Sequence, residues 1–222
     1  MVRKARAQPR RERRPKAKTP GSYHHGDLRA ALLQATASVL AEHGVEGFTL
    51  RECARRAGVS HGAPAHHFRD VRGLLSAFTT ESFEQLATLT REYQRKAPPD
   101  AFSQLVASGV AYVDYALAER ARFQLMFRSD VLDPSDEQLH RAGLAVFEIL
   151  RRDIAAVSAE AGAERAMLAE KTTLAWSIVH GFATLMLENA AFAHVRGDSR
   201  AAHTLIRKLI TLSRPAFERA AS

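Results

Sequence analysis

The sequence predicts an all-α protein in which a small N-terminal helical domain is carried on a larger C-terminal helical bundle. Apolar residues recur at helical spacing along nearly the whole chain, and no segment alternates as a strand would. Glycines and prolines divide the chain into segments of ordinary helix length. We therefore expect about nine helices, over residues 27–43, 49–57, 60–68, 71–95, 100–118, 121–129, 135–161, 164–194 and 199–219.

The N-terminal elements carry clear start and stop signals. The stretch from Thr49 to Glu52 has the pattern of a capping box, in which the hydroxyl and the carboxylate each satisfy a free backbone N–H. Gly58 supplies a sharp turn, and Ser60 can cap a third helix that runs to about residue 68. Residues 97–99, Ala-Pro-Pro, end the fourth helix and predict a domain boundary at that point.

The positive charge of the chain lies at its N-terminus. Residues 1–20 hold nine of the 32 Lys and Arg residues and one of the 24 acids, so the rest of the chain is neutral. With three prolines and few apolar residues, residues 1–22 cannot repay the entropy of ordering and are expected to form a disordered basic arm. The arm has two interpretations, a contact with nucleic-acid phosphates or a solubilising extension, and both stay open.

The single cysteine, Cys53, excludes an intramolecular disulfide and favours a protein of the reducing cytoplasm. Its place inside a helix predicts a small buried residue, although neighbouring arginines would favour a reactive thiol if it were exposed. Residues 172–195 carry one charge, Glu188, and raise the question of a membrane span. His180 and Asn189 interrupt this apolar run, so we expect a buried helix and no membrane contact.

Residues 49–75 hold the most specific pattern of the chain, a capped helix, a turn and a helix of about two turns. Such a short helix is marginal alone and needs the preceding helices as a platform. Its other face then remains free to enter the major groove of DNA. The residues at its N-terminal end, where base edges or phosphates are reached, are Ser60, His61, Gly62 and Ala63. We therefore predict a helix-turn-helix motif over about residues 49–68.

Two runs in the N-terminal part of the chain resemble the N-terminal domain of the TetR/AcrR family of transcriptional regulators. They read YHHGDLRAALLQATASVLAEHG and FTLRECARRAGVSHGAPAHHF, and Leu-Leu follows them. In the C-terminal half, Trp176, His180 and Gly181 in AWSIVHGFATLML resemble the Trp-His-Gly type of ligand-binding domain, and YALAERARFQLMF resembles the helix pair before it. The resemblance implies a DNA-binding domain at 23–86 after the arm at 1–22, and a ligand-binding and dimerisation domain at 87–222.

The resemblance also implies a ligand-responsive regulator that binds a palindromic operator as a homodimer. Family members usually repress transcription and leave the DNA when a small molecule binds. Carried over residue by residue, Thr49 and Ser60 would be caps that also meet phosphate, and His67 would face the DNA backbone. The residues expected toward the bases are His61, Gly62, Ala63 and His66, and the DNA-binding set is completed by Arg51, Arg69 and Arg72.

Two positions depart from the family pattern. Ala65 stands where the family usually has Tyr, and Val71 stands where it usually has Lys; both usual residues contact phosphate. The intrinsic DNA affinity is therefore expected to be lower and less sensitive to salt. Arg69 and Arg72 stand close by and could take over these contacts, and the basic arm could compensate further.

Histidines at 24, 25, 61, 66 and 67 raise the question of a metal site. Their spacing offers no Cys-x-x-Cys partner and no placed carboxylate, so we expect no metal and no cofactor. Polar contact with DNA is the preferred interpretation of these imidazoles. His180 follows Trp176 by one turn and is either a core histidine or a polar anchor in a ligand pocket.

The C-terminal half predicts both a ligand pocket and a dimer interface. Pockets in such bundles form between helices with few polar groups, so we expect a small, mostly apolar effector. The pocket is expected to be lined by Tyr112, Phe123, Met126, Phe127, Trp176 and His180. Residues 174–193 are apolar nearly all round and the last helix has a broad apolar face, so both need cover on two sides. A symmetric four-helix interface is therefore expected, through Val179, Ala183, Leu187, Leu205, Leu209 and Leu212.

Two other classes of function compete with a regulator. An enzyme is disfavoured because the sequence has no nucleophile elbow, P-loop, dinucleotide fingerprint or HExxH motif. The remaining alternative is a nonspecific nucleic-acid-binding protein that acts through its basic arm. Substitution of His61 or Ala63 separates the two, because only the groove interpretation predicts a changed sequence preference.

Overall fold

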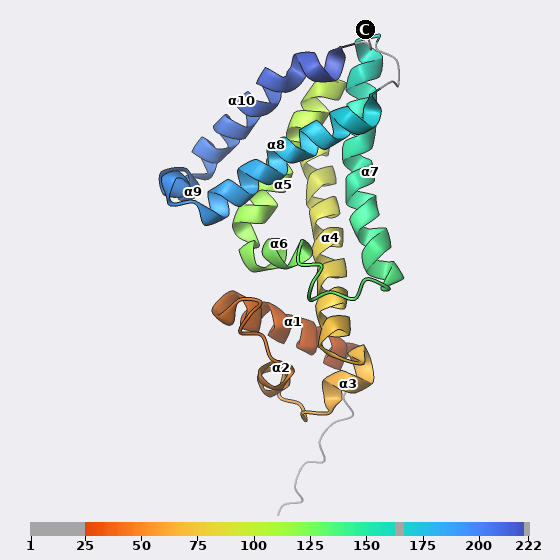
Figure 1. The fold of residues 1–222 in the computed structure, drawn as a ribbon, viewed down its shortest axis with the longest axis vertical. Helices are drawn as coiled ribbons and strands as arrows, with labels where there is room; N and C mark the ends of the chain where they lie inside the picture. Colours follow the sequence, from red (N-terminus) through yellow and green to blue (C-terminus); the bar gives the residue numbers. More distant parts are fainter. Residues whose placement is uncertain (1–24, 163–166, 220–222) are drawn as a thin grey trace, which may run out of the picture.

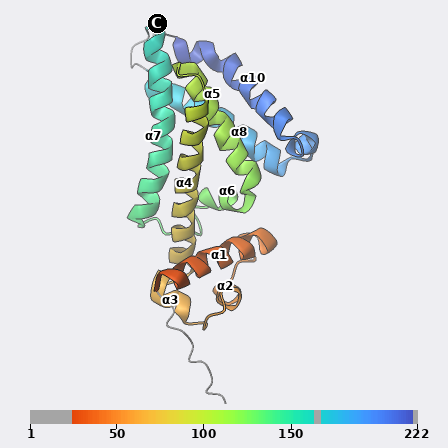
Figure 2. The ribbon, with the colours of Figure 1, turned by 180° about the vertical axis from the view of Figure 1, so that it is seen from behind.

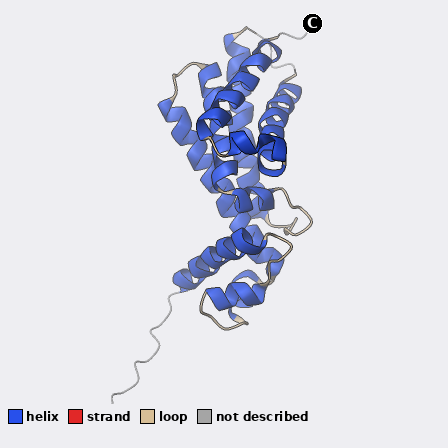
Figure 3. Ribbon diagram, turned by 90° about the vertical axis from the view of Figure 1, so that its left-hand side faces the viewer, coloured by secondary structure: helices blue, strands red, loops and turns tan. Residues whose placement is uncertain are grey.

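The computed structural model describes residues 25–162 and 167–219, which form two helical parts stacked along one axis (Figure 1). No strand occurs among these residues, which confirms the predicted all-α class (Figure 3). The expected arm at 1–22 lies outside the described residues. The elements are α1 (His25–His43), α2 (Leu50–Arg56), α3 (Ala63–Phe68), α4 (Val71–Lys96), α5 (Ala101–Ala118), α6 (Arg120–Met126), α7 (Glu137–Glu160), α8 (Leu168–Glu188), the 3-10 turn η1 (Ala190–Phe192), α9 (Ala193–Arg196) and α10 (Ser199–Glu218).

The N-terminal part consists of α1, α2, α3 and the first turns of α4 (Figure 2). Burial of apolar surface holds these short helices together, and the core side chains with almost no exposure include Leu32, Val39, Leu40, Leu74 and Phe78. Cys53 joins this core, and its Sγ lies 3.4 Å from the carbonyl oxygen of Leu32. Burial raises the pKa of the Cys53 thiol, so the interpretation as a small buried residue is confirmed.

Gly73 allows α4 to begin almost directly after α3. Asp70 caps α4 by accepting a hydrogen bond from the N–H of Gly73 at 2.9 Å. A Cβ atom at Gly73 would lie 2.0 Å from the carbonyl oxygen of Phe68, which is far inside van der Waals contact. The sharp corner between α3 and α4 therefore requires glycine at this position.

α4 runs through both parts of the molecule (Figure 1). Its first half contributes Leu74 and Phe78 to the N-terminal core, and its second half contributes Leu86 to the C-terminal core. The helix ends at Lys96, before the two prolines, as expected. The core changes within α4, however, rather than at residues 97–99, because the helix is long enough to cross from one part to the other.

The C-terminal part is a bundle in which α5 is the central helix, packed against α4, α7, α8 and α10 (Figures 1 and 2). Gly109 brings the two C-terminal helices close to α5. A Cβ atom there would lie 2.4 Å from Cδ1 of Ile210 and 3.2 Å from Cγ1 of Val179. The close approach of three helices at this point depends on the missing side chain.

Helix boundaries differ from expectation in two regions of the C-terminal part. The single helix expected over 164–194 ends at Glu188 and is followed by η1 and α9. Asn189 leaves the helical conformation there, and its side-chain oxygen accepts a hydrogen bond from the N–H of Ala191 at 2.9 Å. The helix expected over 121–129 ends at Met126, and α7 begins at Glu137 because Asp136 caps it.

The apolar sequence of α8 is used for packing within the bundle. The side chains that it buries include Ala175, Phe182 and Met186, which confirms the expected buried helix. Among the described helices, none is long and apolar enough to cross a membrane.

Candidate nucleic-acid interface and internal cavity

Thr49 starts the helix-turn-helix region by capping α2. Its Oγ1 accepts a hydrogen bond from the N–H of Glu52 at 3.2 Å, as the capping pattern predicts. The reciprocal half of the predicted capping box is absent, because the carboxylate of Glu52 instead accepts hydrogen bonds from Arg55 at 2.7 Å and from Arg56 at 2.8 Å. These two guanidinium groups, Arg55 first, lower the pKa of Glu52 to about 2.

α3 begins three residues later than expected. Gly62, not Ser60, is the N-cap residue, and no side chain caps the helix. Pro64 limits how early the helix can begin, because proline lacks the N–H that positions beyond the first turn need, and it stands in the first turn here. Residues 60–62 form a turn instead, in which the N–H of Ala63 donates to the carbonyl oxygen of Ser60 at 3.0 Å.

The residues expected to meet bases lie on the surface of this turn and of α3. Ser60, His61, Gly62 and His66 are exposed, and Ala63 is half-buried; we call these five residues the α3 face. Pro64 and Phe68 are buried and anchor the helix from its other side. α3 lies at the opposite end of the molecule from α10 (Figure 1), and His66 shares a surface hollow with Gln138 at the start of α7. Thr49 and Arg51 are exposed, and His67 is half-buried.

Arg69 and Arg72 make contacts that the sequence did not predict. Nη2 of Arg69 lies 2.9 Å from Oδ2 of Asp133, and Nε of Arg72 donates to the carbonyl oxygen of Leu132 at 3.0 Å. Both acceptors belong to the loop between α6 and α7. These two guanidinium groups therefore join the N-terminal part to the C-terminal part, which competes with their expected use as phosphate contacts.

No three His, Cys, Asp or Glu side chains come together to form a possible metal site in the part of the chain that the structure describes. His24 lies outside that part, and so do the side chains of His25 and its neighbours to residue 27. The exposed histidines of the α3 face are therefore considered as hydrogen-bonding groups.

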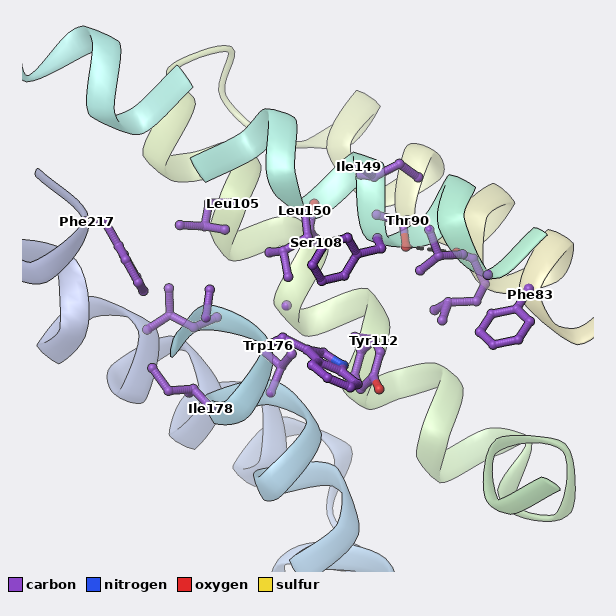
Figure 4. A pocket seen from close by; sticks show the side chains of 18 of the residues that line it. Phe83, Thr90, Leu105, Ser108, Tyr112, Ile149, Leu150, Trp176, Ile178 and Phe217 are labelled. Carbon is purple, nitrogen blue, oxygen red and sulfur yellow. Dashed lines mark hydrogen bonds between the residues drawn. The ribbon is translucent and has the colours of Figure 1, made fainter. Parts of the chain in front are cut away.

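The C-terminal bundle encloses a cavity of about 200 Å³ between α4, α5, α7, α8 and α10 (Figure 4). Its wall is made almost wholly of apolar side chains, and Thr90, Ser108, Tyr112 and Trp176 bring the polar atoms. The lining residues are Phe83, Leu86, Thr90, Leu105, Ser108, Gly109, Tyr112, Phe127, Gly143, Val146, Phe147, Ile149, Leu150, Ala175, Trp176, Ile178, Val179, Ile210 and Phe217.

Three of the six predicted pocket residues, Tyr112, Phe127 and Trp176, line the cavity. Phe123 and Met126 do not: both are buried in the C-terminal core, since α6 turns them into the bundle below the cavity. His180 also lies outside the lining, and its ring packs against the rings of Tyr112 and Phe127.

The hydroxyl of Tyr112 and Nδ1 of His180 form a hydrogen bond of 2.8 Å. Burial raises the pKa of Tyr112, and a hydrogen bond with Trp176 partly offsets this rise. Burial also lowers the pKa of His180, against a weaker opposite effect of Glu188. His180 therefore has a hydrogen-bond partner and supports the cavity wall through Tyr112. It combines features of the two interpretations that the sequence allowed, a core histidine and a polar anchor of a pocket.

Asp153 is a buried residue that sequence reasoning missed. It accepts hydrogen bonds from Ser108 at 2.6 Å and from Gln94 at 3.0 Å, directly behind the cavity wall. One signal was available in the sequence, because Asp153 falls on the same face of α7 as Val146, Leu150 and Val157. A carboxylate on an apolar helix face is costly unless it is paired.

Half of the predicted dimer residues are inside the protomer. Val179, Ala183 and Leu187 are buried against the bundle and cannot reach a partner. α8 is apolar on almost every side, so its pattern did not reveal which side faces inward. Its exposed apolar residues include Leu174 and Leu185, at 40% and 45% exposure. On α10, Leu205 and Leu209 are half-buried, and Leu212 is 78% exposed.

α6 joins the two parts of the molecule. Leu125 is fully buried in the N-terminal core, whereas Phe123 and Met126 belong to the C-terminal core. The next residue, Phe127, reaches the cavity, and Arg128 forms an ion pair with Glu46 of the N-terminal part at 2.8 Å. A change of the cavity wall at Phe127 is therefore one residue away from a contact with the N-terminal part.

Comparison with known proteins relates both parts of the chain to one family of proteins. A family model described as bacterial regulatory proteins, tetR family, matches residues 32–78, and one described as a tetracyclin repressor-like C-terminal domain matches residues 105–209. The HTH-type transcriptional regulator AcrR of Shigella flexneri is 31% identical over 100 residues, 45% of this chain and 46% of that protein. The chain thus spans less than half the length of the curated relatives that it matches.

Solved structures extend the similarity over most of the chain. A protein with unknown function from Rhodococcus sp. RHA1 is 31% identical, with a TM-score of 0.70 over 89% of this chain and 97% of that chain. The TetR family transcriptional regulator PfmR from Thermus thermophilus is 17% identical, with a TM-score of 0.64 over 87% of this chain and 97% of that chain. The second likeness shows the fold alone.

Proposed function

Because the chain belongs to the TetR family of bacterial transcriptional regulators, we propose that it is a repressor released from a palindromic operator by a small, mostly apolar effector. It is a DNA-binding regulator of transcription and not an enzyme. One observation carries the finer proposal. α6 contributes Leu125 to the core of the N-terminal part, and Phe127 at its end reaches the cavity of the C-terminal part, so an occupied cavity has a direct route to the DNA-binding end.

The α3 face is proposed to enter the major groove. Its side chains are small or are imidazoles, which lets the helix approach base edges closely and hydrogen-bond to them. Ser60 and Thr49 would meet phosphate at the rim of the groove, with Arg51 and His67 beside them. Arg69 and Arg72 are better suited to holding the loop after α6, because that loop already accepts their hydrogen bonds.

The dimer is proposed to form through the outer sides of α8 and α10. Leu174 and Leu185 of α8, together with Leu205, Leu209 and Leu212 of α10, provide the accessible apolar surface that the buried residues of α8 do not. A twofold axis through these helices would hold two α3 faces for half-sites roughly 34–36 Å apart or slightly more.

A charge on this surface tests the dimer. Leu212→Glu is expected to make the protein monomeric at micromolar concentration, as measured by sedimentation velocity, with an unchanged helical spectrum. Leu144→Glu is the matched control, because Leu144 is an exposed leucine of α7 that is not part of the proposed interface. If the Leu212→Glu protein remained dimeric, the interface would have to lie on another surface.

The effector is proposed to act on α6. A molecule in the cavity contacts Phe127, and a shift of α6 moves Leu125 within the N-terminal core and disturbs the Arg128–Glu46 pair. Because protein cores are close-packed, such a shift reorients the N-terminal part as a body. The spacing of two α3 faces would then no longer match the operator.

Selection from random double-stranded DNA tests the whole proposal. The full-length protein is expected to recover an inverted repeat, and a protein that lacks residues 1–20 is expected to recover the same repeat with lower affinity and a flatter salt dependence. Recovery of unrelated sequences would instead support the alternative, a nonspecific nucleic-acid-binding protein that acts through the basic arm.

A further inference from the structure

A polar network faces the cavity from within its apolar wall. Ser108 lines the cavity, and its Oγ donates a hydrogen bond to Oδ2 of Asp153 at 2.6 Å. Nε2 of Gln94 donates hydrogen bonds to Oγ of Ser108 at 2.9 Å and to Oδ1 of Asp153 at 3.0 Å, so one lone pair of the Ser108 oxygen remains. These residues, here called the Ser108 network, come from α5, α7 and α4, so three helices fix the position of one hydroxyl (Figure 4 shows Ser108 at the wall).

The charge of this network has no cationic partner in the described contacts. Asp153 is 8% exposed, and both groups that hydrogen-bond to it, on Ser108 and Gln94, are neutral. Burial raises the pKa of Asp153 to about 6, so the carboxylate is mostly ionised at neutral pH. A negative charge therefore lies immediately behind the Ser108 hydroxyl.

The hydroxyl groups of the cavity wall are already engaged with protein partners. The proton of Ser108 is held by Asp153, and Oγ1 of Thr90 donates to the carbonyl oxygen of Leu86 at 2.8 Å. The hydroxyl of Tyr112 is hydrogen-bonded to Nδ1 of His180 at 2.8 Å. Turning the Ser108 hydroxyl toward a ligand would cost a short, charge-assisted hydrogen bond, which is stronger than the neutral one gained.

We propose that the effector is a single-ring, largely apolar molecule with a hydrogen-bond-donating hydroxyl or amine and no anionic group, and that Oγ of Ser108 accepts from that donor with the lone pair that Gln94 leaves. The inference rests on the proposed function, because it names the effector class of the same cavity. The size follows from the volume of about 200 Å³, since an apolar protein cavity of about 150 Å³ can hold benzene. A ligand carboxylate would meet the charge of Asp153 and few free donors.

The single tryptophan of the chain gives a direct measurement, because Trp176 lines the cavity. Fluorescence titration is carried out with para-cresol, para-methylbenzylamine, the methyl ether of para-cresol and para-toluate, four molecules that share one ring. Para-cresol and the amine are expected to bind about five- to tenfold more tightly than the ether, which keeps the shape but loses the donor. Para-toluate is expected to bind most weakly.

Variants of the Ser108 network locate the preference. Ser108→Ala removes the acceptor and is expected to bring para-cresol and its methyl ether to equal affinity. Asp153→Asn removes the charge and is expected to weaken the amine more than para-cresol. Ser177→Ala is the matched control, because Ser177 is an exposed serine next to Trp176 on α8, and it is expected to keep the full preference.

The outcomes separate this inference from the proposed function. Equal affinity of wild-type protein for para-cresol and its ether, or tightest binding of para-toluate, overturns the inference and leaves effector binding in place. Absence of quenching by all four molecules at millimolar concentration overturns the inference together with the cavity as an effector site, and the DNA selection would stand independently. The wild-type series decides the matter even if Ser108→Ala fails to fold.

Discussion

The two parts of the molecule keep their functional groups in opposite places. The N-terminal part has a small closed core and presents the α3 face outward, whereas the C-terminal part turns Ser108 and Tyr112 inward around a cavity. The surface of the first can be changed without touching its packing, but the lining of the second is also part of its core. Substitutions should therefore separate function from stability in one part and combine them in the other.

The largest expected effect comes from a charge on the α3 face. His66→Glu places a carboxylate where two α3 faces of a dimer would meet DNA, and it is expected to weaken operator binding by about a thousandfold, roughly 4 kcal/mol over two sites. The melting temperature should not change, because His66 is exposed. Gel-shift titration measures the affinity, and Arg141→Glu, at an exposed position on α7, is the control. A loss of DNA affinity of less than tenfold would show that α3 is not part of the DNA interface.

A pair of glycines, one in each part, tests where the packing is rigid. Gly73→Ala forces a Cβ atom to 2.0 Å from the carbonyl oxygen of Phe68 and is expected to lower the free energy of unfolding by about 3 kcal/mol. At Gly143 the added atom would lie 3.7 Å from Phe83, an ordinary contact, so Gly143→Ala is expected to stabilise helix α7 by about 0.5–1 kcal/mol. Urea denaturation compares them. Similar effects of both substitutions would contradict the tight corner at Gly73.

The inward-facing chemistry predicts an unusual dependence of stability on pH. Burial raises the pKa of Asp153 from 3.8 to about 6, so the folded protein binds this proton more tightly than the unfolded chain does. The resulting stability is fully present below about pH 4 and is lost as the pH rises through about 6. Asp153→Asn is expected to remove roughly 2 kcal/mol of this pH dependence, as measured by denaturation from acidic to neutral pH.

The control for this titration has the opposite sign. Arg151, and then Arg152, lower the pKa of the half-buried Glu148 to about 2. The stability from Glu148 is therefore present above its unfolded pKa of about 4.5 and is lost as the pH falls. Glu148→Gln should reduce stability only at the neutral end. Parallel pH curves for wild type and Asp153→Asn would mean that Asp153 titrates normally.

The contrast between the two parts also explains what the sequence could predict. Thr49 caps its helix and the α3 face is exposed because both features depend on a few neighbouring residues. Ser60 was assigned as a cap because its chemistry fits, but Pro64 limits how early the helix can begin. Even here, the engagement of Arg69 with Asp133 depends on a residue far along the chain.

The cavity was only half predictable because its lining depends on how helices cross. Phe123 and Phe127 are one helical turn apart in the sequence, yet Phe123 is buried in the core and Phe127 reaches the cavity. Val179 was assigned to a dimer interface because a helix that is apolar all round gives no sign of its inward side. Asp153 stands on the apolar face of α7, but its partners, Ser108 and Gln94, come from two other helices and depend on how these helices pack.

The smallest expected effect lies at the junction of the two parts, where the comparison can be sharpened most. Arg128→Ala removes the ion pair with Glu46, which is largely exposed, so stability should fall by less than about 1 kcal/mol. If α6 carries the signal, the ratio of DNA Kd values with and without para-cresol should shrink by about two- to threefold, because part of the contact that α6 moves is gone. Arg141→Ala is the control, since it removes an exposed ion pair, with Glu137, that lies within α7. An equal ratio in the two variants would place the coupling in the buried contacts of Leu125 rather than at the surface.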